Sequence, residues 1–251
     1  LEADGTDEEQ TDGIVATEAI EQLEKFSKSD QNFFLAVGFF KPHTPYVAPK
    51  KYFDMYDISE IDIPQMNNEF LNTIPEPAAV SLRHKGDGKG NQYDLKKTEA
   101  QEIKRAYYAT ITFLDAQVGR IIKKLKKTGL DKNTIIVFSS DHGYHLGEQG
   151  HWQKQTLYEK TTRVPLIFSG PGIKKGTRSN SPVELIDMYP TLMELTGIKA
   201  PDHVVGKSLV PIFNNSSYKI RNSALTRWIA TRFNNCLLYT SDAADESRGV
   251  G

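Results

Sequence analysis

The sequence predicts an α/β fold in which helices sandwich a mixed, mainly parallel sheet. Residues 134–138 form a nearly continuous apolar run rich in β-branched residues, which is typical of a parallel strand buried on both faces. Residues 98–127 instead repeat apolar side chains at the spacing of a long amphipathic helix. A buried strand that follows a long helix indicates an α/β unit.

The N-terminal part begins with a helix, a strand and a loop. Residues 14–27 carry apolar side chains at helical spacing, and residues 33–37 follow as a short apolar strand. Three prolines between residues 41 and 49 predict a loop, because proline lacks an N–H and fixes φ. Residues 57–91 are rich in Pro, Asn and Gly and are expected to wrap the surface.

The long helix at 98–127 is expected to end at Gly129. Its last turn is rich in lysine, which complements the negative end of the helix dipole, so we assign this basic cluster no function. The apolar stripe predicted to face the core consists of Ile103, Tyr107, Ile111, Leu114, Val118, Ile121 and Leu125.

A polar loop with the composition of a ligand site follows the predicted strand 134–138. Asp141 and His142 emerge where that strand ends, and Gly143 lets the backbone turn sharply. Ligands of open α/β sheets bind outside the carboxyl ends of the strands. An Asp carboxylate suits calcium or magnesium, whereas a His suits a metal neighbour, a proton donor or a zinc ligand. The alternative is a capping Asp beside a hydrogen-bonded His.

The second half of the chain continues with a strand and a helix. Residues 164–168 are a second short apolar run and predict another buried strand. Residues 183–196 predict a helix that starts or kinks at Pro190. Lys154, a dozen residues after the Asp-His pair, supplies a compact positive charge for an anionic group.

Composition narrows the function only by exclusion. The net charge of −1 gives no electrostatic basis for binding nucleic acid or a membrane surface. No apolar run approaches the roughly 20 residues that span a bilayer. The single cysteine, Cys236, excludes an internal disulfide and a cysteine-based zinc cluster. Oligomeric state cannot be predicted from these features.

Three blocks of the sequence resemble the sulfatase family of the alkaline phosphatase superfamily, and are most similar to its iduronate-2-sulfatase-like branch. The resemblance extends over roughly residues 12 to 233 and implies an alkaline phosphatase-like fold with the start of a smaller C-terminal subdomain. The blocks are Phe33 to Pro45, which ends in Lys-Pro-His-Thr-Pro, Tyr107 to Arg120, and Asp141-His142-Gly143 through Pro165 to Phe168.

The resemblance divides the chain into three parts. Residues 1–200 correspond to the C-terminal portion of a catalytic domain, and residues 201–235 to the start of the C-terminal subdomain. Residues 236–251 have no sulfatase counterpart and are expected to be a non-native tail. Because the chain starts with Leu and has no signal peptide before its acidic opening, we expect it to be an N-terminally truncated fragment.

The resemblance also implies a calcium ion and a modified nucleophile. Asp141 and His142 match the pair that holds one Ca²⁺ in sulfatases, together with an N-terminal Asp pair that is missing here. The nucleophile, a formylglycine made in a Cys/Ser-x-Pro/Ala-x-Arg motif, is also missing. The residues after Cys236 do not fit that motif.

The remaining site residues carry over from the Lys-Pro-His loop and from Lys154. By family position, His43 contacts the sulfate or the leaving oxygen and is the candidate general acid. Lys154 is expected to clamp a sulfate oxygen, and Lys41 is either a substrate contact or a solvated loop charge. His43 could alternatively be a rigid surface-loop residue. For His145 and His151 we favour structural roles.

The resemblance implies a sulfuric ester hydrolase whose substrates are sulfated glycosaminoglycans or other polysaccharides. Sulfatases are lysosomal, secreted or periplasmic, which is the location we expect. Two other functions stay open: a phosphodiesterase, phosphonate hydrolase or phosphatase of the same superfamily, and an inactive pseudo-sulfatase that binds sulfated ligands.

Overall fold

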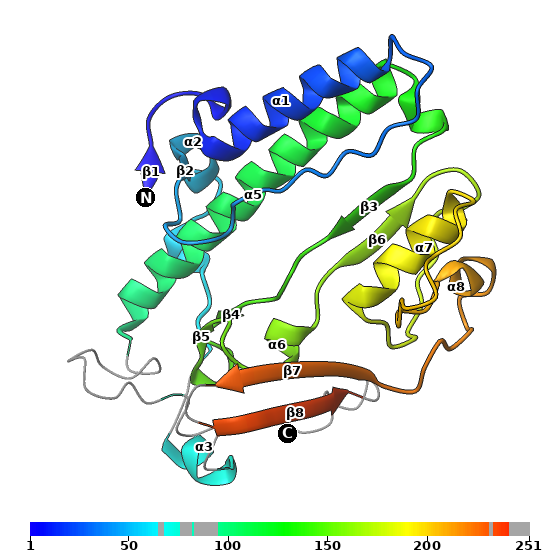
Figure 1. Ribbon diagram of the computed structural model, residues 1–251. Coiled ribbons are helices and arrows are strands. Elements are labelled where there is room, and N and C mark those ends of the chain that lie inside the picture. The colour runs from blue at the N-terminus through cyan, green and yellow to red at the C-terminus, as the bar shows by residue number, and fades with distance from the viewer. Residues whose placement is uncertain (65–67, 76–81, 83–94, 231–232, 241–251) are drawn as a thin grey trace. The chain divides into compact units, whose positions relative to one another are not determined.

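The computed structural model describes residues 1–64, 68–75, 82, 95–230 and 233–240 of the 251-residue chain. These residues form two compact units. The first unit contains residues 1–132 and 146–152, and the second contains residues 133–145 and those from 153 onward. Helices and strands occur in both units (Figure 1), which confirms the predicted α/β class.

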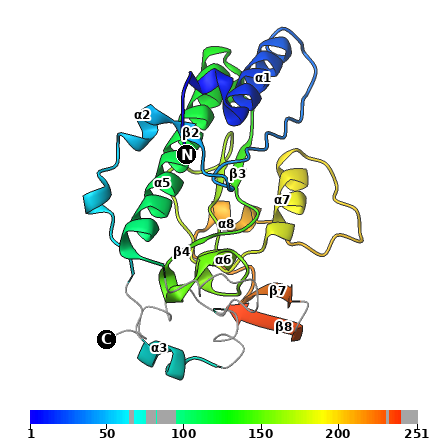
Figure 2. The same ribbon diagram turned by 90° about the vertical axis from the view of Figure 1, so that its left-hand side faces the viewer.

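Two helices, α1 (Thr11–Phe26) and α5 (Lys97–Lys127), form the frame of the first unit. They lie side by side in both views (Figures 1 and 2), and both predicted helices are thereby confirmed. The guanidinium of Arg120 on α5 donates to the Gly13 carbonyl at 3.3 Å and to Thr17 Oγ1 at 2.9 Å. Gly129 follows α5 with a φ of 77°, a left-handed conformation that suits a residue just past a helix end.

The buried face of α5 differs from the predicted stripe. Leu125 is the one stripe residue that is buried, and Ile111 is 38% exposed. Small and polar side chains pack inward because the neighbouring elements approach α5 closely at Ala48, Tyr52 and Phe53. The buried residues of α5 are Ala100, Ala106, Ala109, Thr110, Phe113, Gln117 and Leu125.

Short elements complete the first unit. Strand β1 (Glu2–Ala3) pairs in parallel with β2 (Ala48–Pro49), and α2 (Lys50–Phe53) follows directly. The predicted surface-wrapping segment 57–91 contains a 3₁₀ turn at Ile58–Glu60 and helix α3 (Asn68–Thr73). The rest of that prediction lies largely outside the described residues.

The strand predicted at residues 33–37 does not form a ladder. Residues 32–39 make no backbone hydrogen bond to any other residue that the structure describes. Partly buried and exposed side chains nevertheless alternate along the segment. The Phe33 ring stacks on the Phe26 ring with 4.5 Å between ring centres, while Phe34 is 83% exposed. The prediction of a strand was wrong because an apolar pattern cannot supply a neighbouring strand.

The second unit holds a strand pair at its centre. Strands β3 (Ile136–Ser139) and β6 (Leu166–Ser169) confirm the two predicted strands, but they pair antiparallel, with Ile136 opposite Ser169. The expected parallel pairing and complete burial of β3 are therefore corrected, since Phe138 is 38% exposed and Ile167 is 56% exposed. A two-stranded ladder leaves side chains on both faces accessible.

Helices flank β6, and a hairpin ends the described chain. Helix α6 (Glu159–Thr162) precedes β6. After β6, a 3₁₀ turn at Leu185–Asp187 leads into α7 (Met188–Leu195), which begins two residues before Pro190. Helix α8 (Val210–Asn214) leads to strands β7 (Ala224–Ala230) and β8 (Phe233–Thr240), which pair antiparallel. Strand β8 crosses the boundary predicted at residue 235, and the non-native tail stays a prediction.

A buried carboxylate ties α7 to the chain that follows. Asp187 is fully buried and accepts both Nη groups of Arg221 together with the backbone N–H groups of Glu184 and Lys207, each at 2.8 Å. Burial raises the pKa of Asp187, but these donors outweigh burial and lower the pKa below its usual value.

No described helix combines the length and apolar composition required to cross a bilayer.

The Asp7 cluster makes the stability of the first unit depend on pH. Its carboxylate accepts from Tyr52 Oη at 2.6 Å and Gln117 Nε2 at 3.1 Å, and lies 2.7 Å from Lys51 Nζ. Burial raises the pKa of Asp7, but the three partners outweigh burial and lower the pKa below its usual value. A depressed folded pKa contributes stability above the unfolded pKa of about 3.9, which is lost as the pH falls through the folded pKa.

We therefore expect Asp7→Asn to destabilise the chain by about 1–3 kcal/mol at pH 7 and by less at pH 3. Thermal unfolding of both proteins at the two pH values measures the difference. Asp54→Asn is the matched control, because Asp54 is half-exposed and pairs with Lys50 at the surface. A gap between wild type and Asp7→Asn that does not change with pH would contradict the assignment.

Candidate active site

The predicted site residues are distributed over both units. Lys41 and His43 belong to the first unit, whereas Asp141, His142 and Lys154 belong to the second. Each group forms a local arrangement of its own.

The Lys-Pro-His loop is held by a carboxylate that the sequence analysis did not identify. Asp12, in the first turn of α1, is fully buried and accepts the backbone N–H of Phe40 at 2.8 Å and of Lys41 at 2.9 Å. The N–H of His43 then donates to the Phe40 carbonyl at 2.9 Å, closing a turn. No sequence pattern distinguished Asp12, because the groups that it binds are backbone N–H groups.

Lys41 is a partly buried cation with two local contacts. Its Nζ donates to the Pro45 carbonyl at 2.8 Å and lies 4.9 Å from the centre of the Phe40 ring. Burial lowers the pKa of Lys41, and the negative charge of Asp12 partly opposes that shift. These contacts hold the ammonium group beside the loop, and the choice between a substrate contact and a solvated loop charge stays a prediction.

His43 is exposed and has a defined tautomer when neutral. Its Nδ1 lies 2.7 Å from the Thr44 carbonyl oxygen, which can only accept, so Nδ1 carries the hydrogen. The Phe40 ring supports the imidazole at 5.0 Å between ring centres. Nε2 is left as the nitrogen that can exchange a proton with a ligand, and this is the arrangement that a general acid requires.

Asp141 and His142 lie just past the end of β3, as predicted. The Asp141 side chain is 85% exposed, and its Oδ1 accepts the His142 N–H at 3.0 Å. The His142 Nδ1 donates to the Gly143 carbonyl at 2.9 Å, so Nε2 is the nitrogen available as a ligand in the neutral ring. That Nε2 lies 3.6 Å from Asp141 Oδ2, close enough for both atoms to contact one cation.

These two residues fit part of a calcium shell. Calcium takes six to eight oxygen ligands, and an exposed carboxylate oxygen suits it. No group of three or more His, Cys, Asp or Glu side chains with the spacing of a metal site occurs among the described residues. Asp141 and His142 would supply two of the ligands of such an ion, and the calcium site stays a prediction.

The segment after strand β5 (Trp152–Gln153) fixes the loop that carries Asp141 and His142. The N–H groups of Gly143 and Tyr144 donate to the carbonyls of Thr161 and Lys160, both at 2.8 Å. A Cβ on Gly143 would lie 2.1 Å from the Lys160 carbonyl oxygen, so no other residue fits there without a backbone shift. The glycine was predicted for its turn, and the structure shows that close backbone approach is the stronger reason.

Gly143→Ala is expected to destabilise the protein by about 1–3 kcal/mol, because the added methyl group meets backbone rather than a flexible side chain. Gly119→Ala on α5 is the control: a Cβ there meets nothing within 4 Å, and the change should stabilise the helix by about 0.5–1 kcal/mol. Thermal unfolding of both variants measures the pair. Equal melting temperatures would disprove the close-packing argument.

Lys154 precedes this bonded segment and is partly buried. Its carbonyl accepts the Thr156 N–H at 2.9 Å, and Thr156 Oγ1 lies 2.9 Å from both Thr161 Oγ1 and His145 Nε2. Lys154 and the Gly143 loop are thus connected through one hydrogen-bond network. His145 and His151 are both buried, at 0% and 1% exposed, which agrees with the structural roles predicted for them.

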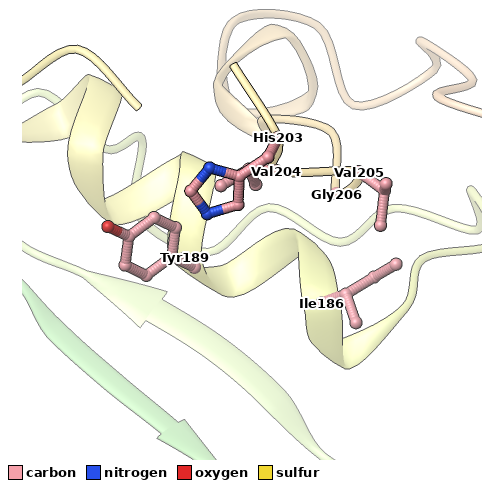
Figure 3. A pocket seen from close by; sticks show the side chains of 6 residues that line it. All are labelled: Ile186, Tyr189, His203, Val204, Val205 and Gly206. Atoms are coloured by element: carbon pink, nitrogen blue, oxygen red, sulfur yellow. The ribbon is translucent and has the colours of Figure 1, made fainter. Parts of the chain in front are cut away.

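An open apolar hollow lies elsewhere on the second unit (Figure 3). It is formed around the start of α7 and contains none of the predicted site residues. A Cβ on Gly206 would lie 2.1 Å from the Ile186 carbonyl oxygen, so the chain packs tightly on the 3₁₀ turn there. Its lining residues are Ile186, Tyr189, His203, Val204, Val205 and Gly206.

Comparison with known proteins identifies the family. The family model described as Sulfatase matches residues 3–198. The chain belongs to the sulfatase family. A sulfatase of Formosa agariphila is 41% identical over 189 residues, covering 75% of this chain and 37% of that protein. Human iduronate 2-sulfatase is 32% identical over 217 residues, covering 73% of this chain and 39% of the enzyme.

The chain therefore spans about two fifths of the length of these sulfatases. Among solved structures, a phosphonate monoester hydrolase from Silicibacter pomeroyi matches with a TM-score of 0.79 and 25% identity, over 98% of this chain and 49% of that chain. This match confirms the alkaline phosphatase-like α/β fold that the sequence resemblance implied, and the family match confirms the resemblance itself.

Proposed function

We propose that the whole protein hydrolyses sulfate esters and that this chain supplies the proton donor, the cationic clamp and part of the metal shell. The single observation that carries the proposal is the His43 arrangement, in which Nδ1 is held by the Thr44 carbonyl and Nε2 is presented from an exposed loop. Family membership supplies the reaction class.

The first requirement of sulfate ester hydrolysis is positive charge around the sulfate group. A sulfate ester carries a negative charge that repels nucleophiles, so cations must neutralise its oxygens as the S–O bond to the leaving group breaks. We assign that task to Lys154 and Lys41. A calcium ion held partly by Asp141 and His142 would add Lewis-acid stabilisation of the same oxygens when bound.

His43 completes the reaction on the leaving side. As the S–O bond breaks, its electron pair goes to the departing oxygen, which takes the proton from protonated His43 Nε2. The Nδ1–H stays on the Thr44 carbonyl and keeps the ring oriented. By resemblance the attacking group is a formylglycine, and no stretch of this chain fits its motif.

We propose sulfated carbohydrates as the substrate class. Two observations support this proposal: the similarity to human iduronate 2-sulfatase and the ammonium group of Lys41 in the Lys-Pro-His loop, whose positive charge suits a sulfate group on a sugar. A lysosomal, secreted or periplasmic location follows from the same likeness. The structural match to a phosphonate monoester hydrolase favours a second candidate, hydrolysis of phosphonate or phosphate esters.

Competing substrates on the full-length protein test these proposals. With calcium present, kcat/KM is measured for 4-nitrophenyl sulfate, 4-nitrophenyl phosphate and a 4-nitrophenyl phosphonate monoester. We expect the sulfate ester to be preferred. A preference for the phosphonate would establish the second candidate, and binding of a sulfated oligosaccharide without turnover of any ester would indicate a pseudo-sulfatase.

A further inference from the structure

We propose that Asp12 is a positioning residue for the reaction, which sets the location of His43 and Lys41 through the backbone of the loop between them. The inference rests on the proposed function for the roles of these two residues. Within the described residues, Asp12 makes no hydrogen bond to either side chain, and its two oxygens accept from main-chain N–H groups instead. Its effect on the reaction would therefore be indirect.

The contacts of Asp12 are more specific than helix capping requires. An acidic residue in a first helical turn ordinarily bonds the free N–H groups of its own helix. Asp12 reaches across 28 and 29 residues to Phe40 and Lys41. These are the last two N–H groups before Pro42, which has none. Both oxygens of a fully buried carboxylate are thus committed to the entry of the loop.

The position of α1 at Asp12 is itself fixed. A Cβ on Gly13 would lie 1.7 Å from the Asp7 carbonyl oxygen, so the start of the helix packs directly on the preceding 3₁₀ turn at Asp7–Glu9. Arg120 on α5 also donates to the Gly13 carbonyl at 3.3 Å. A rigid helix start therefore carries the carboxylate, and displacement of the loop would have to break its bonds.

Two sets of hydrogen bonds connect the backbone that Asp12 holds to the side chains of His43 and Lys41. With Phe40 and Lys41 held, the His43 N–H closes its turn on the Phe40 carbonyl, and the His43 Nδ1 meets the Thr44 carbonyl at 2.7 Å. On the other side, Lys41 Nζ meets the Pro45 carbonyl at 2.8 Å. A carboxylate that pulls two adjacent N–H groups into place thus determines where both functional groups point.

Asp12→Asn tests the proposal, because an amide keeps one acceptor but turns a donor toward a backbone N–H. In the full-length enzyme we expect kcat for an alkyl sulfate, whose leaving group needs the proton from His43, to fall by about 100-fold, the effect of a misplacement near 1 Å. Asp187→Asn is the matched control: Asp187 is equally buried and also accepts two backbone N–H groups, but lies in the other unit. Its kcat should be unchanged at temperatures where the variant is folded.

A spectroscopic measurement separates positioning from loss of folding and from failure of the proposed function. Two-bond ¹H–¹⁵N spectra of this chain labelled at histidine, with His43 assigned by His43→Gln, should show the Nδ1–H tautomer in wild type and a mixture in Asp12→Asn. If Asp12→Asn does not fold, Asp12→Ser, which keeps a short acceptor, takes its place. An unchanged tautomer in Asp12→Asn overturns the proposal, even if the protein hydrolyses no sulfate ester. If it does hydrolyse one, a kcat that falls only in proportion to the folded fraction overturns the proposal as well.

Discussion

In the full-length protein, we expect His43→Gln to lower kcat for alkyl sulfates by about 100- to 10,000-fold, the usual contribution of a positioned general acid. Glutamine retains the size and polarity of the ring but cannot deliver a proton. An alkoxide leaving group needs that proton, whereas 4-nitrophenolate leaves with little assistance. The loss should therefore be much smaller for 4-nitrophenyl sulfate than for an alkyl or sugar sulfate.

The leaving-group dependence separates proton donation from a general loss of structure. His203→Gln is the matched control, because His203 is an exposed histidine on the apolar hollow of the second unit. It should leave kcat unchanged for both kinds of substrate. Equal losses for activated and unactivated sulfates in His43→Gln would make His43 a simple substrate contact. No loss for either substrate would make it a surface-loop residue.

The second large effect is expected at the metal shell. Asp141→Ala removes the one exposed carboxylate of the Asp-His pair and should weaken calcium binding by more than about 100-fold, since residues that only orient a metal ligand already cost 10- to 100-fold. Activity of the full-length enzyme as a function of calcium concentration, together with calorimetric calcium binding, measures the shift.

Asp202→Ala is a suitable control for that loss of charge. Asp202 is also highly exposed in the second unit and forms a surface ion pair with Lys199. Its removal should leave calcium affinity unchanged. If Asp141→Ala bound calcium as tightly as wild type, Asp141 would be a capping residue that bonds the His142 N–H, which was the alternative that the sequence left open.

Local patterns predicted the parts of the fold that depend on local physics. Helices α1 and α5 and strands β3 and β6 followed from apolar spacing, and the polar loop after β3 followed from the end of an apolar run. These features depend on residues close in sequence. The location of Asp141 and His142 past a strand end could therefore be predicted without a structure.

Features that depend on distant partners were not predictable in this way. The buried face of α5 is set by Ala48, Tyr52 and Phe53, which lie about fifty residues earlier in the chain. The apolar spacing of the helix alone indicated a face with larger side chains instead. The pairing of β3 with β6 likewise depends on a distant segment. Asp12 was missed because its partners are backbone groups, which every residue carries and no pattern distinguishes.

The extended stretch before the Lys-Pro-His loop also has a consequence for handling the protein. Residues 31–40 carry no charge, and the backbone groups of residues 32–39 are unpaired within the described chain. Uncharged, apolar segments with open backbone edges pair readily with other copies of themselves. Asp30 and Lys41 flank the stretch, and such charges oppose stacking of like chains. Lys41 would therefore serve solubility in addition to the substrate contact proposed for it, so its removal should promote aggregation even where no substrate is present.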